Sequence, residues 1–432
     1  MKQRIKLPPL IQLIHSWKTI GTFHFYKKFL EESRKPLGNE RSVEQKKPII
    51  YTLTAIRRKI ASLGNLSILI DRCFFVSKNR IIIFNHSTRK RMDKSGLRPL
   101  YLFKKNFNLD DMVVFEDKVS AFTYPKGTVQ FNSECIDQTV GLIGFLLNKY
   151  YKLIYDASDR DIIDFVVKMR LWMVIFAILR PLRIHVLVWY GKEPLIAACK
   201  NMGLDVWDLQ HGVIYEEHPI YNIMDTRNIV GSNFLLPDKC LVYGEYWRQH
   251  LLRSGWAEKK VNVVGYFPDV EPGFLNVSEI PYVLYTSQPH RNQAIIGHIQ
   301  AIEVEVLRRG WRIIIALHPS ESGDAYAEVL SAAVQLSKFD SYDLMRNCIV
   351  HLSVSSTLLW EAMLFEKSSY ILDFGQEAVG LLKDFIKYGY GRTLSEYEFP
   401  EPFILPVSPG PDFFFCSTIN KRLLNGLAVT NH

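Results

Sequence analysis

Two short polar segments of the sequence carry side chains suited to holding a phosphate group. His318 follows a short apolar run that is typical of a buried strand, and Pro319 fixes the backbone directly after it. Ser355, Ser356 and Thr357 follow a second such run and lead straight into an apolar helix. Hydroxyls and free backbone N–H groups at a helix start favour an anion, and a histidine can add a cationic donor near neutral pH. Together the segments predict a phosphate or pyrophosphate site.

Each segment also has an ordinary structural interpretation. Ser355 or Ser356 alone is a common type of helix N-cap, and His318 alone could be a surface residue. We favour the binding site because both segments end consecutive predicted strands within one half of the chain. The ordinary structural interpretation would have to be correct at both strand ends, whereas one binding site explains both segments.

The region from Trp311 to Asp373 alternates between strands and helices. Strands are predicted at 312–317, 348–354 and 369–373, and an apolar helix is predicted at 358–365. Alternation of this kind is typical of a parallel sheet, where ligands bind beyond the carboxyl ends of the strands. We therefore expect both polar segments to face one crevice.

A second set of polar residues ends strands in the first half of the chain. A strand at 184–190, a helix at 195–202 with Gly203 as its stop signal, and a strand at 205–209 form one unit. Gln210, His211 and Gly212 follow that last strand, and glycine would allow a ligand to approach closely. His211 is the favoured general base. Other candidates, each also interpretable as an ordinary charged residue, are Asp208, Glu216 and Glu217.

An earlier strand, predicted at 80–87, ends at His86, and a basic stretch follows it. An anion site and a solvated loop are both open interpretations. Further strands are predicted at 239–243, 261–264 and 281–285, and helices at 136–153, 159–179, 246–254, 293–309 and 377–388.

The length of 432 residues and the positions of proline and glycine predict two domains with two flanking segments. The predicted divisions are a basic N-terminal arm at 1–47, an N-terminal Rossmann-like acceptor domain at 48–275, a C-terminal Rossmann-like donor domain at 276–399, and a proline-rich, irregular tail at 400–432. We expect an α/β fold in which the two domains face each other across a cleft.

The composition is that of a folded protein, with 48% hydrophobic and 22% charged residues. The net charge of +9 suits an anionic membrane, nucleic acid or phosphorylated substrates without choosing among them. The 6 cysteines are scattered, which indicates reduced thiols in a cytosol rather than disulfides or a zinc site. The sequence contains no GxGxxG, Walker or HExxH motif and no helix-turn-helix pattern, so we predict no nucleic-acid partner and no cofactor.

The most membrane-like region, 171–190, is interrupted by Arg180, Pro181 and Arg183 before it reaches the roughly 20 apolar residues that a spanning helix needs. We predict a buried helix ending near Leu179, followed by a strand. Charges throughout the first 30 residues predict no secretory signal. We expect a cytoplasmic protein whose aromatic and basic N-terminal arm either contacts the inner face of the membrane or packs as an ordinary helix.

Two Rossmann-like halves joined near 266–281 resemble the GT-B fold of glycosyltransferases, and the resemblance spans roughly residues 78–395. Leu317-His318-Pro319 and Ser355-Ser356-Thr357 are similar to the His-Pro and Ser-Ser/Thr motifs of bacterial sialyltransferases and capsule Kdo transferases. Segment 210–219 resembles a stretch of surface-polysaccharide transferases. The acidic motif that supplies the sialyltransferase base has no counterpart in this chain.

The resemblance implies metal-independent transfer of a sugar from a nucleotide-activated donor to a hydroxyl of a glycan or lipid-linked glycan acceptor. A CMP-linked acid sugar such as Kdo or sialic acid is the favoured donor. His318, His211 and Glu217 are the catalytic candidates. The donor-binding candidates are Ser287, Gln288, His318, Pro319, Ser355, Ser356, Thr357 and Glu361, and the acceptor-side candidates are His86, Gln210 and Gly212. Glu361 is expected either to bind a ribose hydroxyl or to face solvent.

Three alternatives remain open. Glycerophosphate transferases that use CDP-glycerol share the layout. Non-hydrolysing UDP-sugar 2-epimerases share the two domains and a serine-rich phosphate turn, although the sequence has no convincing set of acidic residues and arginine around a sugar. A non-catalytic scaffold of a polysaccharide assembly complex would keep the fold without turnover.

Overall fold

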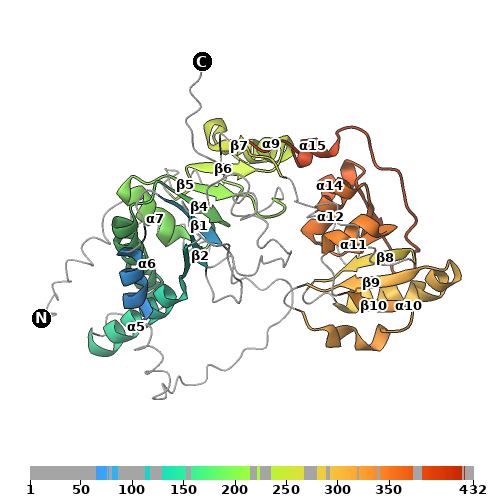
Figure 1. Ribbon diagram of the computed structural model, residues 1–432, viewed down its shortest axis with the longest axis horizontal. Coiled ribbons are helices and arrows are strands. Elements are labelled where there is room, and N and C mark those ends of the chain that lie inside the picture. The colour runs from blue at the N-terminus through green and yellow to red at the C-terminus, as the bar shows by residue number, and fades with distance from the viewer. Residues whose placement is uncertain are drawn as a thin grey trace, which may run out of the picture.

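The computed structural model describes most of two α/β units (Figure 1). The described residues are 65–74, 76, 80–85, 112–116, 129–151, 157–214, 221–223, 235–266, 280–288, 292–318, 321–337, 341–372, 382–420 and 423. The N-terminal arm predicted at 1–47 lies outside this set, and so does the predicted domain boundary at 275.

The first sheet contains seven parallel strands in the order β3-β2-β1-β4-β5-β6-β7. The strands are β1 (Ile81–Asn85), β2 (Met112–Glu116), β3 (Val129–Asn132), β4 (Arg183–Leu187), β5 (Val206–Leu209), β6 (Lys239–Val242) and β7 (Val261–Val263). Their central residues are buried on both faces, which explains the nearly continuous apolar runs in the sequence. Successive strands are added outward in one direction from β1 to β3 and in the other from β4 to β7.

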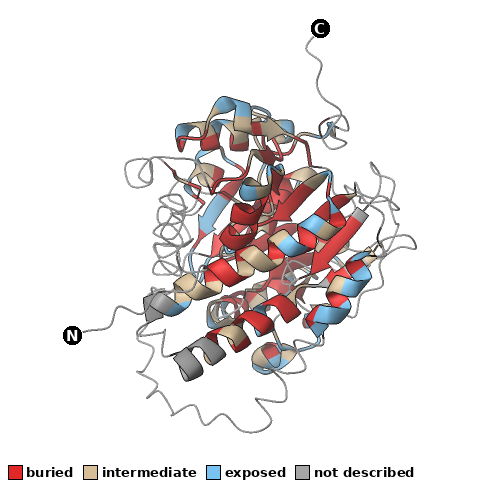
Figure 2. Cartoon of the chain, turned by 90° about the vertical axis from the view of Figure 1, so that its left-hand side faces the viewer, coloured by how far each residue is buried: buried red, intermediate tan, exposed pale blue. Residues whose placement is uncertain are grey.

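One face of this sheet is covered by helices whose inward sides are buried (Figure 2). They are α5 (Glu134–Tyr151), α6 (Ala157–Leu179), α7 (Glu193–Met202) and a helical segment at 65–74. Phe84 of β1 and Phe115 of β2 lie 4.9 Å and 5.4 Å from Trp172 of α6, measured between ring centroids. This aromatic contact joins sheet and helix in the core.

The second sheet contains six parallel strands in the order β10-β9-β8-β11-β12-β13. The strands are β8 (Tyr282–Thr286), β9 (Arg312–Ala316), β10 (Val334–Ser337), β11 (Val350–Ser353), β12 (Ser368–Leu372) and β13 (Gly391–Leu394). The accompanying helices are α10 (Asn292–Arg308), η4 (Gly323–Val329), α11 (Ser341–Asn347), α12 (Thr357–Glu361), η5 (Ala362–Phe365) and α14 (Lys383–Lys387).

The predicted α/β class with two Rossmann-like domains is confirmed by these two parallel sheets. Gly203 ends α7 in the left-handed conformation at φ 68°, as its position as a stop signal predicts. The expectation that the strands before His318 and Ser355 are consecutive is wrong. β10 intervenes in the chain, and β8 lies between β9 and β11 in the sheet.

The two units meet at an aromatic seam between α9 (Glu245–Arg253) and the second sheet's helices (Figure 1). Trp360 of α12 is 1% exposed, and its ring lies 5.5 Å from Tyr246 and 5.3 Å from Trp247 of α9. The Tyr246 hydroxyl donates to Asp384 of α14 at 2.7 Å. These contacts hold helices from both halves of the chain in one buried cluster.

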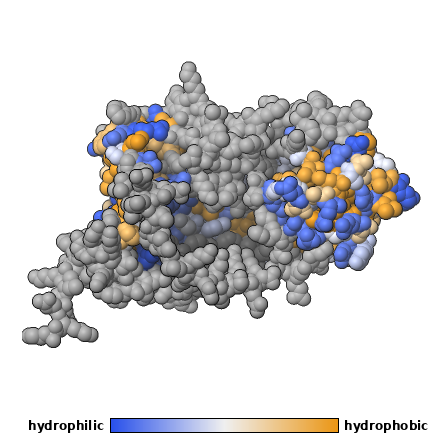
Figure 3. Space-filling view, turned by 90° about the horizontal axis from the view of Figure 1, so that it is seen from below, coloured by the Kyte–Doolittle hydropathy of each residue, from blue (hydrophilic) through white to orange (hydrophobic). Residues whose placement is uncertain are grey.

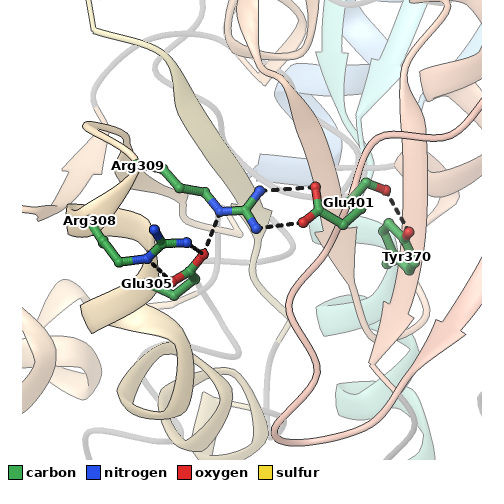
Figure 4. Close-up of polar contacts among 5 residues, drawn as sticks. All are labelled: Glu305, Arg308, Arg309, Tyr370 and Glu401. Atoms are coloured by element: carbon green, nitrogen blue, oxygen red, sulfur yellow. Dashed lines mark hydrogen bonds and ion pairs between the residues drawn. The ribbon is translucent and has the colours of Figure 1, made fainter.

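The segment after β13 crosses the second unit before it reaches the first. Arg309, directly after α10, makes two hydrogen bonds to the Glu401 carboxylate, at 3.0 Å and 2.6 Å (Figure 4). Tyr370 of β12 donates to the Glu401 carbonyl at 2.6 Å. No helix or strand interrupts 400–410, as predicted for the start of the tail.

Beyond that stretch, α15 (Pro411–Phe414) packs beside α9, and the chain then pairs with the ends of β6 and β7. Cys416 N–H donates to the Tyr243 carbonyl at 2.9 Å, and Tyr266 N–H donates to the Cys416 carbonyl at 2.8 Å. Leu423 joins the core on the second face of the first sheet. Part of the predicted tail is therefore packed into the N-terminal unit.

The most apolar helix, α6, ends at Leu179, and β4 begins at Arg183, so the predicted break between helix and strand is confirmed. No helix among the described residues combines the length and the apolar character needed to cross a membrane.

Candidate functional site

Six of the predicted donor residues lie just beyond the carboxyl ends of β8, β9 and β11, namely Ser287, Gln288, His318, Ser355, Ser356 and Thr357. In this sheet the chain adds strands on one side of β8 and then on the other, starting with β11, so these two strands form a topological switch point. Crevices at such points are the usual ligand sites of open α/β sheets. Figure 3 shows a hollow between the described parts of the two units, seen from below.

Gln288 crosses the switch point and binds the segment after β11. Its Oε1 accepts hydrogen bonds from the Ser355 backbone N–H at 2.7 Å and from the Ser355 hydroxyl at 2.9 Å. Because both donors occupy the carbonyl end of the side-chain amide, its NH2 group points the other way. Both residues are half-buried. The arrangement fixes the orientation of the Gln288 side-chain amide.

Ser287 connects the end of β8 to the turn that follows β9. Its hydroxyl accepts from the His318 backbone N–H at 2.8 Å and donates to the Glu321 carboxylate. Glu321 N–H in turn donates to the His318 carbonyl at 2.9 Å. Ser287 is 4% exposed, so its hydroxyl serves to position the turn, while His318 and Glu321 are half-buried.

Ser356 is the N-cap of α12, since its hydroxyl accepts from the Leu358 N–H at 3.2 Å. The structural interpretation of this serine is therefore confirmed. Ser355 and Thr357 flank it and are half-buried, and the Ser355 hydroxyl already donates to Gln288. The predicted segment thus divides into one capping residue, one residue bonded to Gln288, and Thr357 as a further candidate ligand contact.

Glu361 lies at the end of α12 and is 8% exposed, so the expectation that it faces solvent is wrong. Its carboxylate accepts a hydrogen bond of 2.5 Å from the hydroxyl of Tyr342, on α11. The Tyr342 hydroxyl is also 2.6 Å from the hydroxyl of Tyr266, which follows β7 in the first sheet. This pair of contacts reaches from the donor side to the other unit.

On the acceptor side, His211 lies beyond the carboxyl end of β5 and contacts Tyr190, which follows β4. The Tyr190 hydroxyl is 3.2 Å from His211 Nε2. Gln210 is 1% exposed and uses both ends of its amide, donating to the Gly212 carbonyl at 2.8 Å and accepting from Tyr243 N–H at 2.9 Å. Gln210 therefore shapes the segment that carries His211.

Asp208 of β5 is fully buried beneath this segment. Its Oδ2 accepts from the Tyr221 hydroxyl at 2.9 Å, and Cys240 Sγ lies 3.4 Å away. Burial raises the pKa of the Asp208 carboxyl to about 7, against the lowering effect of these hydrogen bonds. Burial also raises the pKa of Glu193, at the start of α7, to about 7. Both carboxyls favour the protonated form more strongly in the fold than in the unfolded chain.

Asp208→Asn is expected to flatten the dependence of stability on pH. The folded carboxyl holds its proton up to pH about 7, whereas the unfolded one releases it near its ordinary value of 3.8. Between these values the folded protein binds more protons, so the free energy of unfolding falls as pH rises. One such group contributes a slope of at most about 1.4 kcal/mol per pH unit. The measurement is denaturant unfolding of wild type and variant from pH 4.5 to 7.

The matched control is Glu328→Gln, since Glu328 is an exposed carboxylate on η4. It should leave the wild-type slope unchanged, and part of the slope should persist in Asp208→Asn because Glu193 has the same direction of shift. Equal slopes in wild type and Asp208→Asn would show that the buried carboxyl stays ionised.

Three predicted site residues, His86, Glu217 and Pro319, lie outside the described residues, as do Glu216 and the His218-Pro219 pair. Among the residues that the structure describes, no three His, Cys, Asp or Glu side chains gather as they would around a metal ion.

The structure adds four residues that sequence reasoning missed: Tyr190, Tyr266, Glu321 and Tyr342. Tyr190 could have been found, because it is the last residue of the predicted strand beside the one that precedes His211. The other three depend on contacts between segments 34 to 76 residues apart, for which the sequence has no local signal.

Comparison with known proteins yields similar folds only. No protein-family model matches the chain, and no curated protein matches its sequence. The UDP-GlcNAc 2-epimerase from Methanocaldococcus jannaschii has a TM-score of 0.48 at 14% identity, covering 81% of this chain and 99% of that chain. MnaA from S. aureus, solved with UDP, has a TM-score of 0.47 at 12% identity, covering 74% and 86%. CalG4, the calicheamicin glycosyltransferase, has a TM-score of 0.45 at 12% identity, covering 78% and 87%.

Proposed function

We propose that this protein is a glycosyltransferase that moves a sugar from a nucleotide-activated donor to a hydroxyl of a glycan acceptor. The observation that carries the proposal is the hydrogen-bonded group at the switch point of the second sheet. Gln288 and Ser355 are joined across the switch point, and His318 is held beside them through Ser287. Convergent donors of this kind suit the phosphate of a nucleotide.

The donor groups also suit the chemistry of the step. When the bond between the anomeric carbon and the phosphate oxygen breaks, the leaving phosphate gains negative charge. Donors fixed in advance around that charge lower the barrier to the reaction. In this proposal the His318 ring, the Gln288 NH2 group and the Thr357 hydroxyl bind the phosphate, and the Ser355 hydroxyl turns from Gln288 to the phosphate when the donor binds. Pro319 belongs to the same proposed site. Glu361 binds the ribose.

The acceptor reacts from the side of the first sheet. The acceptor oxygen forms a bond to the anomeric carbon and loses its proton to a base, while the electron pair of the broken bond leaves with the phosphate. His211 is the favoured base because the Tyr190 hydroxyl, 3.2 Å from its Nε2, orients the ring beyond the carboxyl end of β5. Glu217 is the second candidate. His86, Gln210 and Gly212 are proposed to shape the acceptor side.

A CMP-linked acid sugar such as Kdo or sialic acid is the favoured donor, on the similarity of the His-Pro and Ser-Ser-Thr motifs. A lipid-linked glycan is the acceptor that would bring the protein to the inner face of the cell membrane, where the net charge of +9 favours anionic lipid. Cytoplasmic chemistry with peripheral membrane contact is part of the same proposal.

The first experiment measures thermal stability with CMP, CDP, UDP and GDP. A nucleotide at 100 times its dissociation constant should stabilise the fold by about 2.7 kcal/mol. We expect CMP to give the largest shift. Gln288→Glu keeps the acceptor oxygen but replaces the NH2 group with a like charge facing the phosphate, so the affinity should fall by about 10- to 100-fold. His318→Ala should weaken the affinity in the same direction.

Gln335→Glu is the matched control, because Gln335 lies exposed on β10 of the same sheet and the net charge change is identical. The affinity of Gln335→Glu for CMP should equal that of wild type. A larger shift with UDP or GDP would replace the acid-sugar donor with an ordinary sugar nucleotide. CDP-glycerol turnover or epimerisation of a UDP-sugar would each assign another reaction to the same site. Absence of binding by all four nucleotides would overturn the donor site.

A further inference from the structure

The hydroxyls of Tyr266 and Tyr342 and the carboxylate of Glu361 form a buried line of hydrogen bonds between the two units. Tyr342 donates to Glu361 at 2.5 Å, and the two tyrosine oxygens are 2.6 Å apart. The three residues are 6%, 6% and 8% exposed. Water therefore competes little for these bonds, and the low local dielectric strengthens them.

The direction of the bonds follows from counting protons. A tyrosine hydroxyl has one proton to donate, and that of Tyr342 is donated to Glu361. Because the Tyr342 hydroxyl donates its hydrogen bond to Glu361, Tyr266 must be the donor and Tyr342 the acceptor in the bond between the two tyrosines. Each bond polarises the next, so the order Tyr266 to Tyr342 to Glu361 is stabilised as a unit.

The ring and backbone of Tyr266 contact residues packed on the first unit. Its ring lies 4.3 Å from Tyr243 and 5.2 Å from Phe415, measured between centroids. Its backbone N–H donates to Cys416, in the segment that returns to the first sheet. A rotation of one unit against the other would therefore displace the Tyr266 hydroxyl from Tyr342 and remove a donor from the line.

We propose that Tyr342 is a positioning residue that sets the orientation of Glu361 toward the ribose, and that Tyr266 makes this orientation depend on the arrangement of the two units. The inference rests on the proposed function, since it assigns Glu361 to the ribose of the donor. It adds that recognition of the ribose and the relative position of the units are coupled through two tyrosine hydroxyls.

The test measures how well the protein distinguishes a ribose from a ribose that lacks its hydroxyls. Dissociation constants are measured by calorimetry for CMP and UDP, each beside its 2′,3′-dideoxy analogue. Wild type should prefer the ribose form by about tenfold or more, the effect of one or two hydrogen bonds to a charged group. Tyr342→Phe should bring this preference close to one, because Glu361 loses the partner that orients it. Tyr266→Phe should reduce the preference partly.

Tyr282→Phe is the matched control, because Tyr282 is equally buried in the same unit and its hydroxyl donates to the Leu344 carbonyl of α11 at 2.7 Å. It should keep the ribose preference even where its melting temperature falls. If Tyr342→Phe fails to fold, Tyr266→Phe still tests whether the ribose preference depends on the tyrosine line, since this variant leaves the contact between Tyr342 and Glu361 in place.

The outcomes separate this inference from the proposed function. If wild type binds neither CMP nor UDP, both the proposed function and the tyrosine inference are contradicted. Wild type that binds with no ribose preference, or both tyrosine variants with the full wild-type preference, overturns the tyrosine line while the nucleotide site stands. Equal loss of the preference in Tyr282→Phe would assign the effect to general loosening of the unit and would also overturn it.

Discussion

Trp360→Ala is expected to lower the free energy of unfolding by about 3–5 kcal/mol, as large-to-small changes of buried aromatic residues do. Trp360 is 1% exposed, and besides α9 its ring contacts Phe385 at 5.0 Å and Phe414 at 5.3 Å. The cavity would open where both units and α15 meet, so it cannot be filled by rearrangement within one of them. The variant should also lose coupling between the units and unfold in two separated transitions.

Differential scanning calorimetry of the full chain measures both effects. The matched control is Phe165→Ala, a buried aromatic residue of α6 inside the first unit, which should destabilise that unit without separating the seam. A single transition in Trp360→Ala, shifted no further than that of Phe165→Ala, would mean that the aromatic seam does not couple the two units.

Gly244→Ala is the second large effect we expect, a loss of about 3 kcal/mol or more through overpacking. A Cβ at this position would lie 2.4 Å from the Phe414 carbonyl oxygen and 2.6 Å from that of Phe413. Both neighbours are backbone atoms, so no side-chain rotation relieves the contact. The backbone at Gly244 is extended, at φ −157°, and the effect is therefore one of space and not of conformation. α15 should be displaced from α9.

Limited proteolysis of residues 411–420 and denaturant unfolding measure this displacement. Gly141→Ala is the control, since Gly141 lies within α5 and a Cβ there meets nothing within 4 Å. It should be neutral or stabilising by up to about 1 kcal/mol, as alanine favours a helix. Equal stability and equal protease resistance in Gly244→Ala and wild type would contradict the close packing of the C-terminal segment.

The sequence predicted those parts of the fold that depend on local patterns. The apolar runs before His318 and Ser355 predicted β9 and β11, and Gly203 predicted the end of α7. The gathering of four candidate residues at one edge of the second sheet was also predicted, because parallel strands place their carboxyl ends at one edge whatever their order. Ser287, Gln288, His318 and Ser355 indeed lie there together.

Other features depend on contacts that no local pattern encodes. β10 and β13 are short strands at the two edges of the second sheet, and their mixed polar sequences resemble loops. The seam joins Tyr246 to Asp384 across 138 residues, and Trp247 donates to the Phe414 carbonyl across 167. The burial of Glu361 within the site was likewise not predictable from local sequence, because it depends on Tyr342, from a different helix. Pairings over such separations are set by the packing of whole units.

The return of residues 411–423 to the first sheet has a consequence for biosynthesis. Leu423 packs on the same face as Ile83 and Leu241, and the Asn420 N–H donates to the Val264 carbonyl at 3.0 Å. A chain emerging from the ribosome thus carries an N-terminal unit that lacks part of its core until translation has passed residue 423. The second sheet, whose strands all lie between 282 and 394, is complete earlier. During synthesis the C-terminal unit can therefore finish folding first, while the uncovered apolar face of the nascent N-terminal unit is available to chaperones.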